Sequence, residues 1–173
     1  GAIDLYVANY GVWSIETNDY CGDRDRGVRL FCRPTYITPE IHTLLRNRGD
    51  GTFEETTERA GIARHDGRGQ GVVAADVNGD GHVDLYVAND MSPNFLFLNN
   101  GDGSFRDFTM LSGAAHDGNG AALAGMAVDA TDLDADGRGN FPGQDQVFHL
   151  PAFFDRPHVR RRPIFGHVFV SGE

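Results

Sequence analysis

The chain has 173 residues, 40% of them apolar, and a formal net charge of −10. This length fits a globular domain with a core of its own, and no apolar run approaches the roughly 18 residues that a membrane-spanning helix needs. Nucleic-acid binding requires clustered Lys and Arg to neutralise phosphates, so the acidic composition argues against a nucleic-acid partner.

The first residues already belong to a repeat. Residues 1–9, GAIDLYVAN, resemble residues 81–89, GHVDLYVAN. We therefore expect the chain to begin partway through a repeating unit of a longer protein, and no signal peptide can be read from it.

An insertion at residues 11–40 interrupts the first unit and contains both cysteines. Cys21 and Cys32 enclose a short loop in a segment with little core of its own. A disulfide there would contribute roughly 3 kcal/mol in the chain-entropy model. We expect this disulfide, which is typical of oxidising compartments; two free thiols are the alternative.

The middle of the chain reveals the length of the repeat. The segment NRGDGTFEETT at 47–57 returns as NNGDGSFRDFT at 99–109. Short segments rich in Val, Leu, Phe and Tyr and bounded by Gly, Asn and Asp predict four strands per unit. In the middle unit, the strands are expected at about residues 71–75, 85–89, 94–98 and 105–109. Units of this length and strand number are typical of β-propeller blades.

A propeller ring needs about four to eight blades to close, so we expect an all-β chain that forms two to three four-stranded antiparallel blades of a larger ring. The expected divisions are a first blade at 1–70, a second at 71–122, the start of a third at 123–140 and an atypical tail at 141–173.

The segment DVNGDGHVD at 76–84 places oxygen-bearing side chains directly before an apolar strand. In a loop of the form D-x-[DN]-x-D-G-x-x-D, these side chains and one backbone carbonyl can wrap a Ca²⁺ ion, and Gly81 permits the sharp turn. Without a cation, the carboxylates would repel by about 1 kcal/mol per pair even in a water-like dielectric. The expected ligands are Asp76, Asn78, Asp80, the carbonyl of His82, and Asp84.

A solvated turn rich in Asp and Asn is the alternative interpretation of this loop. An EF-hand is excluded because its twelfth loop position requires Glu, whereas Val87 occupies that position here. The ion-loop pattern of residues 76–84 recurs in the third unit. In the first unit only the last ligand position of this pattern is present. The further expected ligands are Asp132, Asp134, Asp136, the carbonyl of Arg138, Asn140, and Asp4 of the first unit.

Other motifs are interpreted as turns. His65-Asp66-Gly67 and His116-Asp117-Gly118 recur at equivalent places beside glycine, which favours turns over hydrolytic metal sites. After residue 140 the repeat is lost, since FPGQD stands where LYVAN is expected. We interpret residues 141–173 as a non-native or frame-shifted tail; an appended functional segment is the alternative.

The segments DVNGDGHVDLYVAND and NFLFLNNGDGSFRD resemble the FG-GAP/VCBS repeat of integrin-α-type β-propellers. The Cys-bearing insertion, GVVAAD and AGMAVD are similar to bacterial secreted proteins related to cartilage acidic protein, which often carry an ASPIC/UnbV region. The resemblance covers about residues 1–140 and implies a seven-bladed propeller with Ca²⁺ in its inter-strand loops. The lost strand after Asn140 departs from this family pattern.

We therefore expect a calcium-binding propeller module that is secreted, periplasmic or on the cell surface and that binds a protein or glycan. The alternative is a fragment of a propeller enzyme whose active site lies on blades outside this chain. Inward-facing His, Asp or Glu side chains from several blades would favour the enzyme.

Overall fold

The fold is all-β. The computed structural model describes residues 3–16, 18–130, 141–142 and 147–148, and among them the only helical element is one short 3-10 turn. No helix in this part of the chain is long and apolar enough to cross a membrane. The elements are β1 (Leu5–Val7), β2 (Cys21–Asp23), β3 (Val28–Leu30), η1 (Pro34–Tyr36), β4 (Thr43–Asn47), β5 (Phe53–Glu55), β6 (Gly69–Ala75), β7 (Asp84–Asn89), β8 (Phe95–Asn99), β9 (Phe105–Asp107), β10 (Phe141–Pro142) and β11 (Val147–Phe148).

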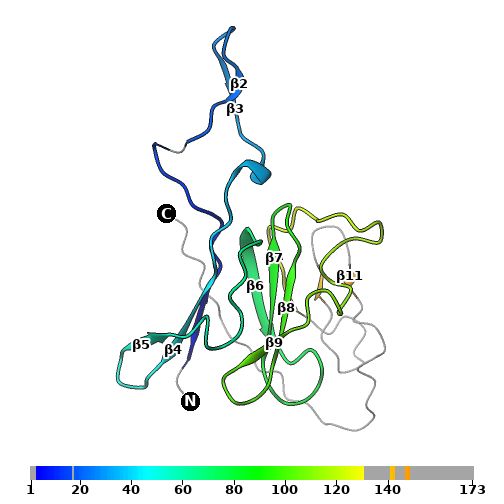
Figure 1. Cartoon of the computed structure of the whole chain (residues 1–173). Helices are drawn as coiled ribbons and strands as arrows, with labels where there is room; N and C mark the ends of the chain where they lie inside the picture. The colour runs from blue at the N-terminus through cyan, green and yellow to red at the C-terminus, as the bar shows by residue number, and fades with distance from the viewer. Residues whose placement is uncertain (1–2, 17, 131–140, 143–146, 149–173) are drawn as a thin grey trace.

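Strands β6, β7, β8 and β9 form a four-stranded antiparallel sheet in chain order, which we call the second sheet (Figure 1). The four predicted strands of the middle unit are confirmed. Strand β6 begins two residues earlier than predicted, at Gly69, with a register shift before Gly71. Strand β9 ends at Asp107, because the backbone N–H of Leu96 bonds to the side-chain hydroxyl of Thr109 at 3.2 Å instead of continuing the ladder.

Strands β1, β4 and β5 form the first sheet, which repeats the order of β7, β8 and β9. Leu5 pairs with Leu45, as Leu85 pairs with Phe97 in the second sheet. The first sheet has three strands rather than the four expected of a complete unit, since none of the described residues supplies a counterpart of β6.

The core lies on both faces of the second sheet. Successive side chains of a strand point to opposite faces, so Leu85 and Val87 join one apolar cluster and Tyr86 joins the other. The first cluster also contains Tyr6 and Leu44 of the first sheet and Ala8, which directly follows β1, together with Ala60, Ile62, Phe95 and Phe97. The second contains Val77, Leu96, Leu98 and Ala114, with Val128 and Ala130 packed against it.

The insertion projects away from both sheets as the β2–β3 hairpin, followed by η1 (Figure 1). In the third unit, Ala124 forms an isolated antiparallel bridge with Asp90. Strands β10 and β11 pair with each other through Phe141 and Phe148. The remainder of the predicted tail at 141–173 lies outside the described residues, so its interpretation stays a prediction.

Candidate functional site

The loop at residues 76–84 joins β6 to β7 and is shaped by its first carboxylate. Oδ1 of Asp76 accepts the backbone N–H groups of Gly79 at 2.6 Å and Asp80 at 3.1 Å, and Oδ2 accepts that of Gly81 at 3.0 Å. Gly79 and Gly81 have φ angles of +77° and +92°, a region that glycine enters at little cost. The glycine positions therefore let the chain wrap around a single carboxylate.

Asn78 and Asp80 contact each other in the middle of this loop. Nδ2 of Asn78 donates to Oδ2 of Asp80 at 2.8 Å, while Oδ1 of Asn78 accepts the Asp80 N–H at 2.9 Å. Oδ1 of Asp80 accepts the N–H of His82 at 2.8 Å. Three of the predicted ligands are thus joined by hydrogen bonds on an exposed turn.

Asp84, the last predicted ligand of the loop, is completely buried at 0% exposure. Its Oδ2 accepts the N–H of Val77 at 2.9 Å and its Oδ1 accepts that of Asn99 at 2.8 Å. Burial raises the pKa of Asp84 to about 6; the two amide bonds oppose this shift, and the charges of Asp80 and Asp76 add to it. None of the ion pairs within the described part of the chain includes Asp84.

The loop provides an oxygen-only set of donors, which suits a hard cation such as Ca²⁺. A carboxylate oxygen can accept about two bonds. Oδ1 of Asp76 already accepts two, but its Oδ2 and the oxygens of Asp80 and Asp84 each accept one, so the loop retains room for coordination. Across the described residues, no three His, Cys, Asp or Glu side chains form a ready-made metal cluster. The structure thus places the predicted ligands in one loop without gathering their acidic groups into a cage.

The first unit repeats the end of this loop. Asp4 accepts the N–H of Asn47 at 2.8 Å, and the Asn47 amide donates to the carbonyl of Ile3 at 3.0 Å. In the second unit, Asn99 makes the same two bonds, to Asp84 and to the carbonyl of Val83. Asp4 is therefore the structural equivalent of Asp84, although it is exposed.

The predicted third-unit ligands lie outside the described residues, and their role stays a prediction: Asp132, Asp134, Asp136, Arg138 and Asn140.

The predicted disulfide is confirmed. Cys21 and Cys32 are bonded, with their Cα atoms 5.2 Å apart, at the base of the β2–β3 hairpin. Both strands of the hairpin are largely exposed, and the side chains of Arg24 and Arg29 lie 4.7 and 5.7 Å from the ring centroid of Tyr20. The insertion thus has the small core expected for it, and the covalent bond closes it.

A pocket of about 770 Å³ lies beside the hairpin and was not predicted from the sequence. Its apolar wall includes Trp13 and Phe31, which are 63% and 103% exposed, and its polar groups include Asp19 and Arg29. The signal for this surface was present in the sequence, since large apolar residues recur in a segment too short to bury them. The full lining is Val12, Trp13, Asn18, Asp19, Arg29, Leu30, Phe31, Cys32, Tyr36, Ile37 and Thr38.

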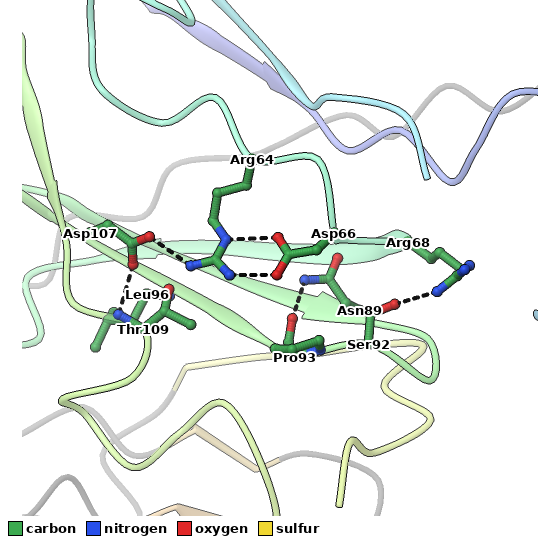
Figure 2. Close-up of polar contacts among 9 residues, drawn as sticks. All are labelled: Arg64, Asp66, Arg68, Asn89, Ser92, Pro93, Leu96, Asp107 and Thr109. Atoms are coloured by element: carbon green, nitrogen blue, oxygen red, sulfur yellow. Dashed lines mark hydrogen bonds and ion pairs between the residues drawn. The ribbon is translucent and has the colours of Figure 1, made fainter. Parts of the chain in front are cut away.

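Arg64 binds one carboxylate of the first unit and one of the second (Figure 2). It pairs with Asp66 through two bonds of 2.9 and 2.6 Å and with Asp107 of β9 through a third of 2.6 Å. The guanidinium also lies 4.5 Å from the ring centroid of Phe95. Asp66 therefore takes part in a structural ion pair, in agreement with the interpretation of its His-Asp-Gly segment as a turn.

Arg68 joins the base of the insertion to the loop after β7. Its Nη1 donates to the Ser92 hydroxyl at 2.7 Å (Figure 2), and its Nε donates to the carbonyl of Ile37 at 2.8 Å. Nearby, the Tyr10 hydroxyl donates to Asp90 at 2.8 Å. Burial, followed by this bond, raises the pKa of Tyr10 to about 12. These contacts orient the insertion against the second unit, and they join residues too far apart in sequence to be predicted from local pattern.

Antiparallel sheets of this order, with one sheet packed on the next, define a β-propeller repeat module, a class that serves in molecular interaction. The sequence profile of the FG-GAP-like repeat matches residues 38–87 and 76–139, which together span more than half of the chain. The chain belongs to the FG-GAP-like repeat family.

The chain is also similar to cartilage acidic protein 1 of several species. Over 67 residues it is 42% identical to the Homo sapiens and Xenopus tropicalis proteins and 40% identical to the Mus musculus protein. The match covers 37% of this chain and 10% of each relative, so the chain spans about a tenth of the length of these relatives. The resemblance noted from the sequence is thereby confirmed.

Proposed function

We propose that this propeller module binds Ca²⁺ in the loop at 76–84, works outside the cytoplasm, and presents its insertion to a protein or glycan. The observation that carries the proposal is the fully buried carboxylate of Asp84, whose pKa is raised by burial and further by the charges of Asp80 and Asp76 in the same loop. An ionised group in this position is costly without a partner of opposite charge.

A divalent cation in the loop would offset that cost. Bound Ca²⁺ supplies positive charge that favours the ionised form of each carboxylate. The residues that would hold it are Asp76, Asn78, Asp80, the carbonyl of His82, and Asp84. With one amide and one carbonyl among five donors, and with Asp80 and His82 exposed, we expect the weak affinity of extracellular modules, about 10⁻⁴–10⁻³ M.

Two observations support a location outside the cytoplasm. The Cys21–Cys32 bond closes a hairpin with almost no core, and such bonds persist in oxidising compartments. The similarity to cartilage acidic protein 1 agrees with this location. A weak calcium site is also best suited to the high calcium concentrations found outside cells.

The insertion supports the interaction role. Exposed aromatic side chains with a polar rim are typical of sites that bind other molecules, and the pocket beside the hairpin has Trp13, Phe31 and Tyr36 in its wall. Because the disulfide and Arg68 both fix this segment, its aromatic side chains are presented at little conformational cost on binding.

Calorimetric titration of the full chain with CaCl₂ tests the metal site. We expect binding by the unsubstituted chain and its loss in Asp80→Ala. The matched control is Asp50→Ala, which removes a carboxylate from the similar NRGDGT turn of the first unit, where Asp50 accepts the N–H and the hydroxyl of Thr52. An Asp80→Ala variant with unchanged affinity would show that the ion binds elsewhere.

The interaction role is tested by applying the labelled chain to an immobilised glycan panel and to an extracellular protein library. A Trp13→Ala, Phe31→Ala double variant should lose the signal, and Met110→Ala, which replaces an exposed apolar residue outside the insertion, should retain it. Equal binding by both variants would exclude the insertion as the contact surface.

A further inference from the structure

The loop at 76–84 is joined to the hairpin turn at 99–104, which connects β8 to β9. The N–H of Asn99 donates to Asp84 at 2.8 Å, and the Asn99 side-chain amide donates to the carbonyl of Val83 at 2.9 Å. The Asn99 side-chain oxygen accepts the N–H of Gly101 at 2.9 Å. One residue therefore fixes both a predicted ion ligand and the geometry of the neighbouring turn.

A second contact joins the same two segments. A Cβ atom at Gly101 would lie 2.5 Å from Nε2 of His82, so the His82 ring packs directly against the turn. The backbone carbonyl of His82 is one of the predicted ligands. Movement of the hairpin turn would consequently disturb both His82 and Asp84.

The far end of the turn is held by the first unit. The N–H of Phe105 donates to the carbonyl of Ala60 at 2.8 Å, and Asn99 and Phe105 are paired across β8 and β9. The turn thus spans the distance between the candidate ion loop and the interface of the first and second units.

The first unit contains a natural control for these contacts. Asn47 donates through its N–H to Asp4 and through its amide to Ile3, and its oxygen accepts the N–H of Gly49 at 2.8 Å. These bonds match those of Asn99, but in this chain Asp4 is not preceded by the other ligand positions of an ion loop. The hydrogen bonds of the asparagine therefore form whether or not a complete ion loop is present.

We propose that Asn99 is a positioning residue for the ion loop, and that ion binding at 76–84 in turn orders the hairpin turn at 99–104. This inference rests on the proposed function. An ion that holds the Asp84 carboxylate also holds the acceptor of the Asn99 N–H, so opening of the turn must compete with ion binding. Coupling of this kind is reciprocal: a well-ordered turn strengthens ion binding by the same factor.

Two measurements on the full chain test the coupling. Asn99→Ala keeps the backbone N–H bond to Asp84 but loses the side-chain bonds to Val83 and Gly101, which hold that N–H in place. In calorimetry with CaCl₂ it should bind about tenfold more weakly, the loss typical of removing a group that orients a metal ligand. Asn47→Ala removes the same side-chain bonds from the first unit and should bind with unchanged affinity. Equal affinities of Asn99→Ala and the unsubstituted chain would overturn the inference and leave the proposed function intact.

Hydrogen exchange of the unsubstituted chain supplies a readout that needs no variant. At free Ca²⁺ ten times the Kd, exchange of the Asn99 and Gly101 amides should slow by about tenfold if their opening requires ion release. The amides of Asn47 and Gly49 should not change. Unaltered exchange at 99–104 in chain that calorimetry shows to be loaded would overturn the inference, whereas no calcium binding at all would overturn the proposed function and the inference with it.

Discussion

The first and second sheets are built from the same repeat but are covered to different extents. In the second sheet, every residue of β7 is buried, because the first sheet covers one face and residues of the third unit cover part of the other. In the first sheet, Leu5 and Val7 of β1 are only half-buried, although they are the equivalents of Leu85 and Val87. The same apolar pattern therefore yields full burial only where a sheet has two neighbours.

This difference explains the sequence pattern itself. A sheet with one solvated face usually shows alternation of apolar and polar residues, whereas a sheet covered on both faces shows a continuous apolar run. The runs LYVA at 5–8 and LYVA at 85–88 are identical. The first sheet thus carries the sequence of a blade covered on both faces, and we expect its open face to pack against another unit.

Truncation of matched core residues should give the largest contrast between the two sheets. Phe97 is 0% exposed, so Phe97→Ala should lower the free energy of unfolding by about 4 kcal/mol. Its equivalent, Leu45, is half-buried, and Leu45→Ala should cost about 1–2 kcal/mol. Urea unfolding followed by circular dichroism measures both. Equal costs would mean that the open face of the first sheet is covered in solution.

A pH titration should separate His42 from its equivalent in the second sheet, Asn94. The hydroxyl of Tyr6 shares a 2.7 Å hydrogen bond with Nδ1 of His42. Burial lowers the pKa of His42 to about 4, outweighing the carbonyl of Gly67 and the charge of Asp66, which raise it. The ordinary pKa of histidine is about 6.5, so between pH 6.5 and 4 His42 is protonated in the unfolded chain and neutral in the folded chain. The free energy of unfolding therefore falls as the pH drops through this interval.

The predicted loss in that interval is about 3 kcal/mol, with little further contribution from His42 below pH 4. Thermal unfolding at a series of pH values measures it. His42→Asn copies the residue of the second sheet and should remove this part of the pH dependence. If the variant and the unsubstituted chain lose stability in parallel between pH 6.5 and 4, His42 is not the group responsible.

Calcium should distinguish the ion loop of the second unit from its remnant in the first. For a Kd of about 10⁻⁴–10⁻³ M, 10 mM Ca²⁺ should stabilise the folded chain by about 1.4–2.7 kcal/mol. Asp84→Asn should abolish this stabilisation, whereas Asp4→Asn should preserve it. Urea unfolding with CaCl₂ or with EDTA provides the comparison. Stabilisation that survives Asp84→Asn would place the ion at another site.

The smallest expected effect concerns the ion pairs of Arg64 and Arg59. The side chain of Arg64 is 20% exposed and binds two carboxylates, whereas that of Arg59 is 63% exposed and, among the described residues, pairs with Glu54 alone. Arg64→Lys loses the bidentate geometry of guanidinium and should lower the free energy of unfolding by about 1 kcal/mol. The expected loss is this small because the two carboxylates are partly exposed to solvent. Arg59→Lys should leave the urea midpoint unchanged. A larger change for Arg59→Lys would contradict this ranking.

The sequence by itself determined the elements that depend on neighbouring residues. Short apolar runs bounded by Gly, Asn and Asp predicted all four strands of the second sheet, because alternation and turn chemistry act over a few positions. The spacing of the repeat predicted the correspondence of residues 47–57 with 99–109, which the equivalent bonds of Asn47 and Asn99 confirm. The disulfide between Cys21 and Cys32 was predicted because the two cysteines enclose a short loop in a segment with little core of its own.

The tertiary structure decided what depends on packing between units. The burial of Asp84, the lowered pKa of His42 and the contacts of Arg68 all arise where separate segments meet. Tyr10 and Asp90, for example, are 80 positions apart, and no local pattern relates them. The end of β9 was likewise set by the Thr109 hydroxyl bonded to β8. Local propensity fixes where strands form, but the environment of each side chain follows only from which sheets cover it.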